Sequence, residues 1–263
     1  MNQKIGVIIP SYNESENIYL LIQKIFAVLS EATIIIVDDS SIDENKKLID
    51  SIRYSKSLKK KNITVISRFK KSGRGSAVVL GLKEMLKNKK IQYFFEMDAD
   101  LVHDPKDFNK FIKKIESDKA QVIIGSRYLS ESKIIKWTLK RLILSKIVNA
   151  FINICLGLKL SDYTNGFRLY NRDAVEFLTR IELRESGFIA LSEIVYRLKN
   201  NNFIINEVPI NFNDIAFGKS SADHKEFASA LLGLIRIKIF SSQTKDCSVT
   251  QTNRSEVFKR QTF

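Results

Sequence analysis

The stretch YFFEMDAD, residues 93–100, joins a short apolar run to two carboxylates that are separated by one residue. Its first five residues, 93–97, have the aromatic-rich composition of a buried β-strand, and the loop that follows begins at Asp98. Comparable apolar runs, rich in β-branched residues, occur at residues 5–9, 33–37, 63–66 and 122–124. The first half of the chain therefore contains at least five predicted strands.

Amphipathic segments with helical spacing separate these strands, at residues 16–29, 44–52, 77–87 and 107–115. Strands that alternate with helices at such distances predict the α/β class, with a Rossmann-like, mostly parallel sheet that is flanked by helices on both faces. Right-handed crossovers place the carboxyl ends of all parallel strands along one edge of the sheet. We expect ligands to bind at that edge.

The second half of the chain has a different pattern. An apolar-rich segment at residues 136–160 is interrupted by Lys140, Arg141 and Lys146, and helical patterns follow near 173–179 and 192–198. A strand is expected at 203–208 and a last helix at 227–240. We predict a single domain over residues 1–240 and a disordered polar tail over 241–263, because the tail is aperiodic.

The chain is strongly basic, with 43 Lys and Arg against 29 Asp and Glu and a net charge of +14. Such a surplus fits nucleic acid, an anionic membrane surface or phosphorylated small molecules, and the absence of a nucleic-acid-binding motif argues against the first. Cys155 and Cys247 are far apart, so we expect two free thiols in a reducing compartment. Because neither a targeting signal nor a long apolar run is visible, we expect a cytoplasmic protein, soluble or held at a membrane surface.

The carboxylates Asp98 and Asp100 follow their strand closely enough to share one ligand. Hard divalent cations such as Mg²⁺ or Mn²⁺ prefer oxygen ligands, so the pair is a candidate metal site. An isolated Asp-X-Asp is also common in solvated turns and helix caps. Taken alone, the motif leaves both readings open.

Two further loops have the same ambiguity. Asp38 and Asp39 end a strand and either cap the next helix or bind a ribose or base. Residues 70–75 (KKSGRG) either cradle a phosphate at a helix start or form a flexible basic turn. Since all these loops are expected at one sheet edge, the functional interpretation gains weight.

The order of the motifs resembles family 2 glycosyltransferases with the GT-A fold. The residues that carry the resemblance are PSYNE at 10–14, VDDSSID at 37–43, KSGRG at 71–75 and MDADL at 97–101. Downstream, GSRY at 125–128, WTLKR at 137–141, GFRLY at 166–170 and EVPI at 207–210 resemble the dolichol-phosphate, or polyprenyl-phosphate, mannosyltransferase branch. The resemblance extends from about residue 5 to residue 240.

The resemblance implies roles for individual residues. The nucleotide sugar would be held by Pro10, Tyr12, Glu14, Asp39, Lys71, Gly73, Asp98, Ala99, Asp100 and Lys219. The metal would lie between Asp98 and Asp100. The acceptor phosphate would face Arg127, Arg141 and Ser145, and the catalytic group would be Asp98, Asp100, Arg127 and Arg141. Segment 137–160 would be an amphipathic, acceptor-side helix at a membrane surface, with an ordinary core helix as the alternative.

The implied reaction is an inverting transfer of a hexose, mannose above all, from a nucleotide sugar such as GDP-mannose to a polyprenyl or dolichyl phosphate at the cytoplasmic membrane face. Two departures keep alternatives open: relatives carry an arginine where this chain has Ile215 and a lysine where it has Ser221. The alternatives are another donor such as UDP-glucose, a polysaccharide acceptor, or a catalytically silent scaffold that binds nucleotide sugars. The sequence leaves the oligomeric state undetermined.

Overall fold

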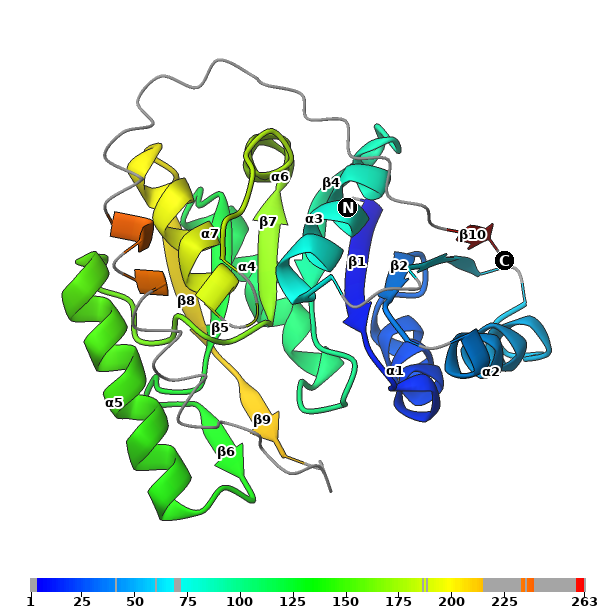
Figure 1. Ribbon diagram of the computed structural model, residues 1–263, viewed down its shortest axis with the longest axis horizontal. Helices are drawn as coiled ribbons and strands as arrows, with labels where there is room; N and C mark the ends of the chain where they lie inside the picture. The colour runs from blue at the N-terminus through cyan, green and yellow to red at the C-terminus, as the bar shows by residue number, and fades with distance from the viewer. Residues whose placement is uncertain are drawn as a thin grey trace.

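A central eight-stranded sheet organises the computed structural model of the protein, which describes residues 4–40, 42–59, 61–68, 72–185, 187, 189–214, 233–234, 236–238 and 259–262. The strand order is β10-β3-β2-β1-β4-β7-β5-β8 (Figure 1). The strands of this sheet are β1 (Lys4–Ser11), β2 (Thr33–Asp38), β3 (Asn62–Ser67), β4 (Ile91–Glu96), β5 (Val122–Ser126), β7 (Arg168–Asn171), β8 (Ile205–Pro209) and β10 (Lys259–Thr262).

Helices connect and cover these strands. They are α1 (Ser15–Val28), α2 (Ile42–Arg53), α3 (Arg74–Leu86), the short 3-10 helix η1 (Pro105–Asp107), α4 (Phe108–Ser117), α5 (Leu139–Leu156), α6 (Arg172–Leu178) and α7 (Ile189–Asn200). A second, two-stranded sheet pairs β6 (Lys133–Ile135) with β9 (Asn211–Asn213).

Strands β3, β2, β1 and β4 are neighbours and all parallel, so their carboxyl ends meet at one edge. Strand β7 lies antiparallel between β4 and β5, and β8 is parallel to β5. The predicted mostly parallel sheet is therefore confirmed. The antiparallel direction of β7 was not predicted, because the GFRLY motif at 166–170 carries no sign of which strands it pairs with.

Successive residues of a strand point to opposite faces of the sheet, and both faces are buried. Val7 and Ile9 belong to the apolar cluster with α1, α2 and α4, whereas Ile8 belongs to the cluster with α3, α6 and α7. This two-sided burial explains why the strands are continuous apolar runs rather than alternating patterns.

The end of the chain departs from its prediction. Residues Lys259–Thr262 form β10, which pairs antiparallel with β3, from Lys259 beside Ser67 to Thr262 beside Thr64. The expectation of a disordered tail over 241–263 is wrong for these four residues, and residues 241–258 lie outside the described part of the chain. Within the expected helix 227–240, residues 233–234 and 236–238 are helical. Cys155 is a free thiol, as expected, and Cys247 lies outside the described residues.

Candidate active site

Two neighbouring aspartates at the end of β2 have different partners. Asp38 accepts hydrogen bonds from the Ser40 hydroxyl at 2.6 Å and the Asn45 amide at 2.8 Å, so it fixes the turn into α2. Asp39 forms a buried two-pronged ion pair with Arg68, with Nε–Oδ1 at 2.6 Å and Nη2–Oδ2 at 2.8 Å. Its Oδ2 also accepts the Ser72 N–H at 3.1 Å. Asp39 thus ties the end of β2 to the loop after β3.

The end of β4 carries the two carboxylates that the sequence singled out. Asp98 is about one-third exposed, at 31%, and its Oδ1 accepts from Arg74 Nε at 2.9 Å and Nη2 at 2.7 Å. The other edge of the Arg74 guanidinium pairs with Glu96, whose side chain is fully buried. The Asp100 carboxylate accepts a long hydrogen bond, 3.4 Å, from the Val102 N–H.

The two aspartates differ in protonation. Burial opposes ionisation of Asp98, but the positive charge of Arg74, its hydrogen bonds and the charge of Arg127 outweigh it, so the pKa of Asp98 lies below its usual value. Burial, together with the charges of Asp98 and Glu14, raises the pKa of Asp100 to about 7. The charge of Asp98 thus disfavours a second negative charge on Asp100, and a cation between the two carboxylates would remove this repulsion.

The donor chemistry of this pair fits a divalent cation. Both groups are hard oxygen ligands, and Mg²⁺ usually takes one or two protein carboxylates together with water and substrate phosphates. Within the described ranges, no cluster of three or more His, Cys, Asp or Glu side chains has the arrangement of a metal site. A cation held by Asp98 and Asp100 would therefore need ligands from outside the protein, as a diphosphate supplies.

His103 joins this loop to the segment before β7. Its ring is buried, its Nδ1 accepts the Asp98 N–H at 3.3 Å, and its Nε2 lies 2.8 Å from Asn165 Oδ1. Burial lowers the pKa of His103, and a neutral ring with its proton on Nε2 satisfies both contacts. His103 thus positions the backbone of Asp98.

Two of the three predicted acceptor residues, Arg127 and Arg141, lie beside Trp137. The guanidinium carbons of Arg127 and Arg141 lie 5.3 Å and 4.5 Å from the centre of its ring. Arg127 is 9% exposed and donates to Asp162 through Nε at 2.7 Å and Nη2 at 2.8 Å. Arg141 is 40% exposed and pairs with Asp214. Ser145 hydrogen-bonds the Tyr128 hydroxyl. Arg127 is thus committed to the protein, and Arg141 faces solvent.

The loop of residues 161–166 is held in place from two sides. Arg168, fully buried, donates to the carbonyls of Asn165, Leu191 and Tyr163 at 2.8–2.9 Å. Glu207 accepts from the Ser161 N–H at 2.9 Å and from its hydroxyl at 2.7 Å. The GFRLY and EVPI motifs therefore fix the loop that presents Asp162 to Arg127 and Asn165 to His103.

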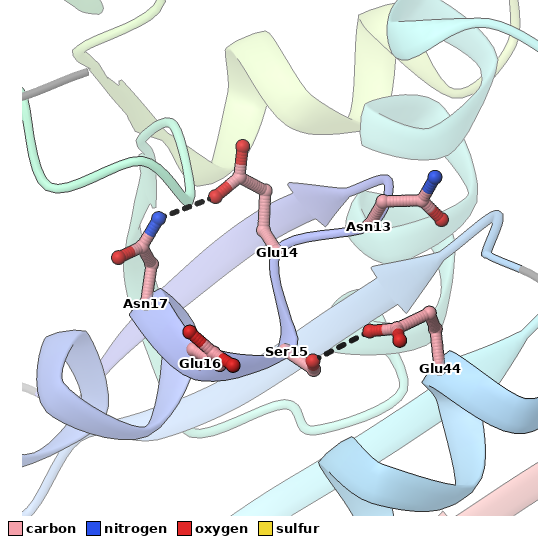
Figure 2. A pocket seen from close by; sticks show the side chains of 6 residues that line it. All are labelled: Asn13, Glu14, Ser15, Glu16, Asn17 and Glu44. Atoms are coloured by element: carbon pink, nitrogen blue, oxygen red, sulfur yellow. Dashed lines mark hydrogen bonds between the residues drawn. The ribbon is translucent and has the colours of Figure 1, made fainter. Parts of the chain in front are cut away.

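A cavity of about 370 Å³ opens at the amino end of α1 (Figure 2). It is lined by Asn13, Glu14, Ser15, Glu16, Asn17 and Glu44. The Asn17 amide donates to Glu14 at 2.6 Å, and the Ser15 hydroxyl donates to Glu44 at 2.7 Å. Three carboxylates repel a bare diphosphate, so this cavity suits hydroxyl and amino groups that donate hydrogen bonds.

The predicted donor residues and the predicted acceptor residues form two groups at this edge of the sheet. Glu14, of the donor group, lies close enough to Asp100 to affect its pKa, and Arg127, of the acceptor group, lies close enough to Asp98 to affect its pKa. The two groups are therefore neighbours. Tyr12, two residues after Pro10, has an exposed side chain, and Ala99 is buried between Asp98 and Asp100. Gly73 directly precedes α3 and has a backbone φ of 90°. Lys71 and Lys219 lie outside the described residues.

Three residues of the site were missed from the sequence. Arg74 lies within the KSGRG loop, whose glycines are the signal of a phosphate-binding turn, and no local pattern marks the arginine. His103 follows Asp98 by five residues, and nothing local distinguishes a site histidine from a core histidine. Asp162 precedes the GFRLY motif, and only the fold shows that it meets Arg127.

The sequence model described as glycosyl transferase family 2 matches residues 6–179. This chain belongs to that family. It is therefore a glycosyltransferase, and the family that the motifs indicated is confirmed. The match includes both carboxylates of the Asp98 loop, Arg74 and Arg127, and it ends before β8.

Two curated relatives and one solved structure are similar to this family member. It is 30% identical over 87% of its length to polyprenol monophosphomannose synthase of Mycolicibacterium smegmatis, covering 84% of that protein. It is 27% identical to undecaprenyl-phosphate mannosyltransferase of Micrococcus luteus, over 89% of this chain and 93% of the relative. Glucosyl-3-phosphoglycerate synthase of Mycobacterium tuberculosis, solved with Mn²⁺ and UDP-glucose, superposes with a TM-score of 0.59 at 17% identity, over 100% of this chain and 87% of that one. The structural likeness confirms the GT-A fold.

Proposed function

We propose that this glycosyltransferase moves mannose from a nucleotide sugar, with GDP-mannose as the first candidate, to a polyprenyl phosphate at the cytoplasmic face of a membrane. Both curated relatives are named for mannosyl transfer to a polyprenyl phosphate. The observation that carries the proposal is the cluster of Arg127, Trp137 and Arg141. Arg141 lies in the first turn of α5, and Arg127 is close enough to Asp98 to lower its pKa.

The donor would occupy the edge between β1, β2 and β4. By family resemblance, Tyr12, Glu14 and Asp39 would hold the nucleoside. The carboxylates of Glu14 and Asp39 can accept from the amino and hydroxyl groups of a base and ribose. Pro10, Gly73, Lys71 and Lys219 remain proposed donor contacts by family resemblance. Asp98 and Asp100 would hold Mg²⁺ or Mn²⁺, which neutralises the diphosphate as it leaves.

The acceptor needs no general base. A phosphate monoester is anionic near neutral pH, so one of its oxygens can attack the anomeric carbon directly as the bond from that carbon to the diphosphate breaks. In-line attack inverts the anomeric centre. Arg141 and Ser145 would bind the acceptor phosphate, and Arg127 would add positive charge from its fixed place beside Asp162. The Trp137 indole N–H, buried and without a partner among the described residues, is a further donor.

Helix α5 suits a lipid acceptor. It exposes six large apolar side chains, Leu139, Ile143, Leu144, Ile147, Phe151 and Ile154. It contains Lys140, Arg141 and Lys146 and has no Asp or Glu. Such a helix lies in the interface of an anionic bilayer, with its apolar face among the acyl chains and its lysines at the phosphates. None of the described helices is long and apolar enough to cross a membrane.

A transfer assay tests the reaction. GDP-mannose and UDP-glucose, each with a labelled sugar, are incubated with polyprenyl phosphate vesicles and Mn²⁺ or Mg²⁺, and label is counted in the lipid phase. We expect label from GDP-mannose that disappears with EDTA. Transfer only from UDP-glucose would refute the donor, and transfer only to soluble glycans would refute the acceptor.

Vesicle flotation tests the surface. The Ile143→Ser/Ile147→Ser double variant should lose binding to vesicles that contain anionic lipid, because it removes apolar area from the exposed face. Leu20→Ser, which changes an exposed apolar residue on α1, is the matched control and should bind as the unmodified chain does. Equal binding by all three proteins would rule out α5 as the docking surface.

A further inference from the structure

Arg74 lies between three segments of the site. It begins α3 directly after Gly73, and its side chain reaches the end of β4. Nε and Nη2 donate to Asp98 Oδ1 at 2.9 Å and 2.7 Å, Nη1 pairs with Glu96, and Nη2 lies 3.4 Å from the Gly166 carbonyl. A Cβ at Gly166 would collide with this guanidinium and meet Asp98 Oδ1 at 2.7 Å. The fold is shaped around the pair of Arg74 and Asp98.

The two partners of Arg74 are not equivalent. Glu96 is fully buried, and its second oxygen accepts the Tyr170 hydroxyl at 2.8 Å, so it anchors one edge of the guanidinium. Asp98 is partly exposed and belongs to the carboxylate pair that fits a cation. The other edge of Arg74 therefore rests on a group that must change partners if a cation binds there.

The site also needs positive charge for a diphosphate. The carboxylates at the end of β4 are close together, because Glu14 and Asp98 both raise the pKa of Asp100, and Glu96 and Asp98 both pair with Arg74. Arg68 forms a buried ion pair with Asp39, and Arg127 forms a buried ion pair with Asp162, so neither charge is available to a diphosphate. Of Arg68, Arg74 and Arg127, only Arg74 pairs with a residue of the proposed cation site, Asp98.

We propose that Arg74 is a ligand of the donor diphosphate and that, before the donor binds, it competes with the divalent cation for Asp98. This inference rests on the proposed function and deepens it. The planar guanidinium matches phosphate oxygens in a two-pronged geometry. A cation alone binds weakly because Asp98 is already paired. When a diphosphate takes over the free edge of Arg74, Asp98 is released, and cation and diphosphate bind cooperatively.

Binding measurements on Arg74→Gln test this exchange. Calorimetry of the metal-free protein with Mn²⁺ alone should show an affinity about tenfold higher than in the unmodified chain, since the competing ion pair is gone. At saturating Mn²⁺, the affinity for GDP or UDP should fall about tenfold, because a charge-assisted phosphate contact is lost. Binding of the nucleosides guanosine and uridine should stay unchanged. A purely structural role would weaken all of these interactions together.

Two variants control for folding. Arg74→Gln leaves Glu96 buried without its cation, so the double variant Arg74→Gln/Glu96→Gln repeats the measurement with that carboxylate neutralised. Arg172→Gln is the matched arginine control: its guanidinium bonds the Leu86 and Ile91 carbonyls at 3.0 Å and 2.9 Å and touches neither aspartate. It should leave Mn²⁺ and nucleotide affinities unchanged.

The outcomes separate the two proposals. Unchanged or weaker Mn²⁺ binding in both Arg74 variants, or unchanged diphosphate binding, overturns the role of Arg74 while the proposed function stands. If the unmodified chain with Mn²⁺ binds neither GDP nor UDP, the proposed function fails, and the role of Arg74 fails with it.

Discussion

Replacing Asp100 by asparagine should make the metal-free protein more stable, relative to the unmodified chain, as the pH rises from 5 to 8. The folded pKa of Asp100 is about 7, against an ordinary value of 3.8. The folded state therefore holds this proton more tightly than the unfolded state. The stability that the proton contributes is fully present below the unfolded pKa and is lost as the pH rises through about 7. Asparagine does not titrate, so the variant loses no stability at this position as the pH rises.

The size of the effect follows from the shift. Two pH units, from pH 5 to the folded pKa, correspond to about 2.7 kcal/mol at ~1.36 kcal/mol per unit. Asp100 is partly accessible to water, and part of its shift depends on the neighbouring charge of Asp98, so we expect about 1–2 kcal/mol. Over the same range, the variant gains this amount of unfolding free energy relative to the unmodified chain.

Urea unfolding in EDTA at pH 5, 6, 7 and 8 measures this difference. Glu31→Gln, which removes an exposed carboxylate, is the control and should show no comparable pH dependence. Adding Mn²⁺ at pH 8 should reverse the order, because the cation stabilises only the chain that binds it. A difference between Asp100→Asn and the unmodified chain that stays constant from pH 5 to 8 would refute the assigned charge state of the carboxylate pair.

Four further perturbations probe other parts of the structure. Gly166→Ala should lower both the thermal midpoint and the Mn²⁺ affinity, since the added Cβ displaces Asp98; unchanged Mn²⁺ affinity would contradict this. Deleting residues 259–263 should reduce the unfolding free energy by about 1–3 kcal/mol in urea titrations, because β3 loses its edge partner, and no change would show that β10 adds nothing. Arg141→Ala should raise the acceptor KM more than the donor KM, and equal changes would count against its role. Arg127→Lys should lower the thermal midpoint, because lysine cannot replace its two-pronged pair.

The fold was largely predictable because its information is local. Buried strands on a two-sided sheet are continuous β-branched or aromatic runs, and β1 to β5 could be found from that pattern. Strand β10 could not be found, since Lys259–Thr262 contains no apolar residue and pairs with β3 through its backbone. Pairing between segments about 200 residues apart leaves no mark in the local composition of either one.

The carboxylates of the site could be predicted from the sequence, but the arginines that pair with them could not. Strand ends at one edge predicted that Asp39, Asp98 and Asp100 would face a common region, because topology alone brings them together. Which arginine meets which carboxylate depends on side-chain geometry across three loops. Arg68 and Arg74 thus look equivalent in the sequence, although one closes a buried pair and the other reaches the carboxylates at the end of β4.

Arg127 and Arg141 illustrate the same division within the proposed acceptor site. Both lie within stacking distance of Trp137, so the indole ring connects them. Arg127 donates to both carboxylate oxygens of Asp162. If Arg127 exchanged this buried partner for a lipid phosphate, the Asp162 carboxylate would be left without a counter-charge. Arg141 is four-tenths exposed on α5, beside the apolar residues of that helix, and its partner Asp214 lies at the end of the β9 segment. Arg141, which lies at the proposed lipid surface, can therefore exchange its partner at a small cost in free energy. Arg127 stays buried beside Asp162, and its fixed positive charge acts on Asp98.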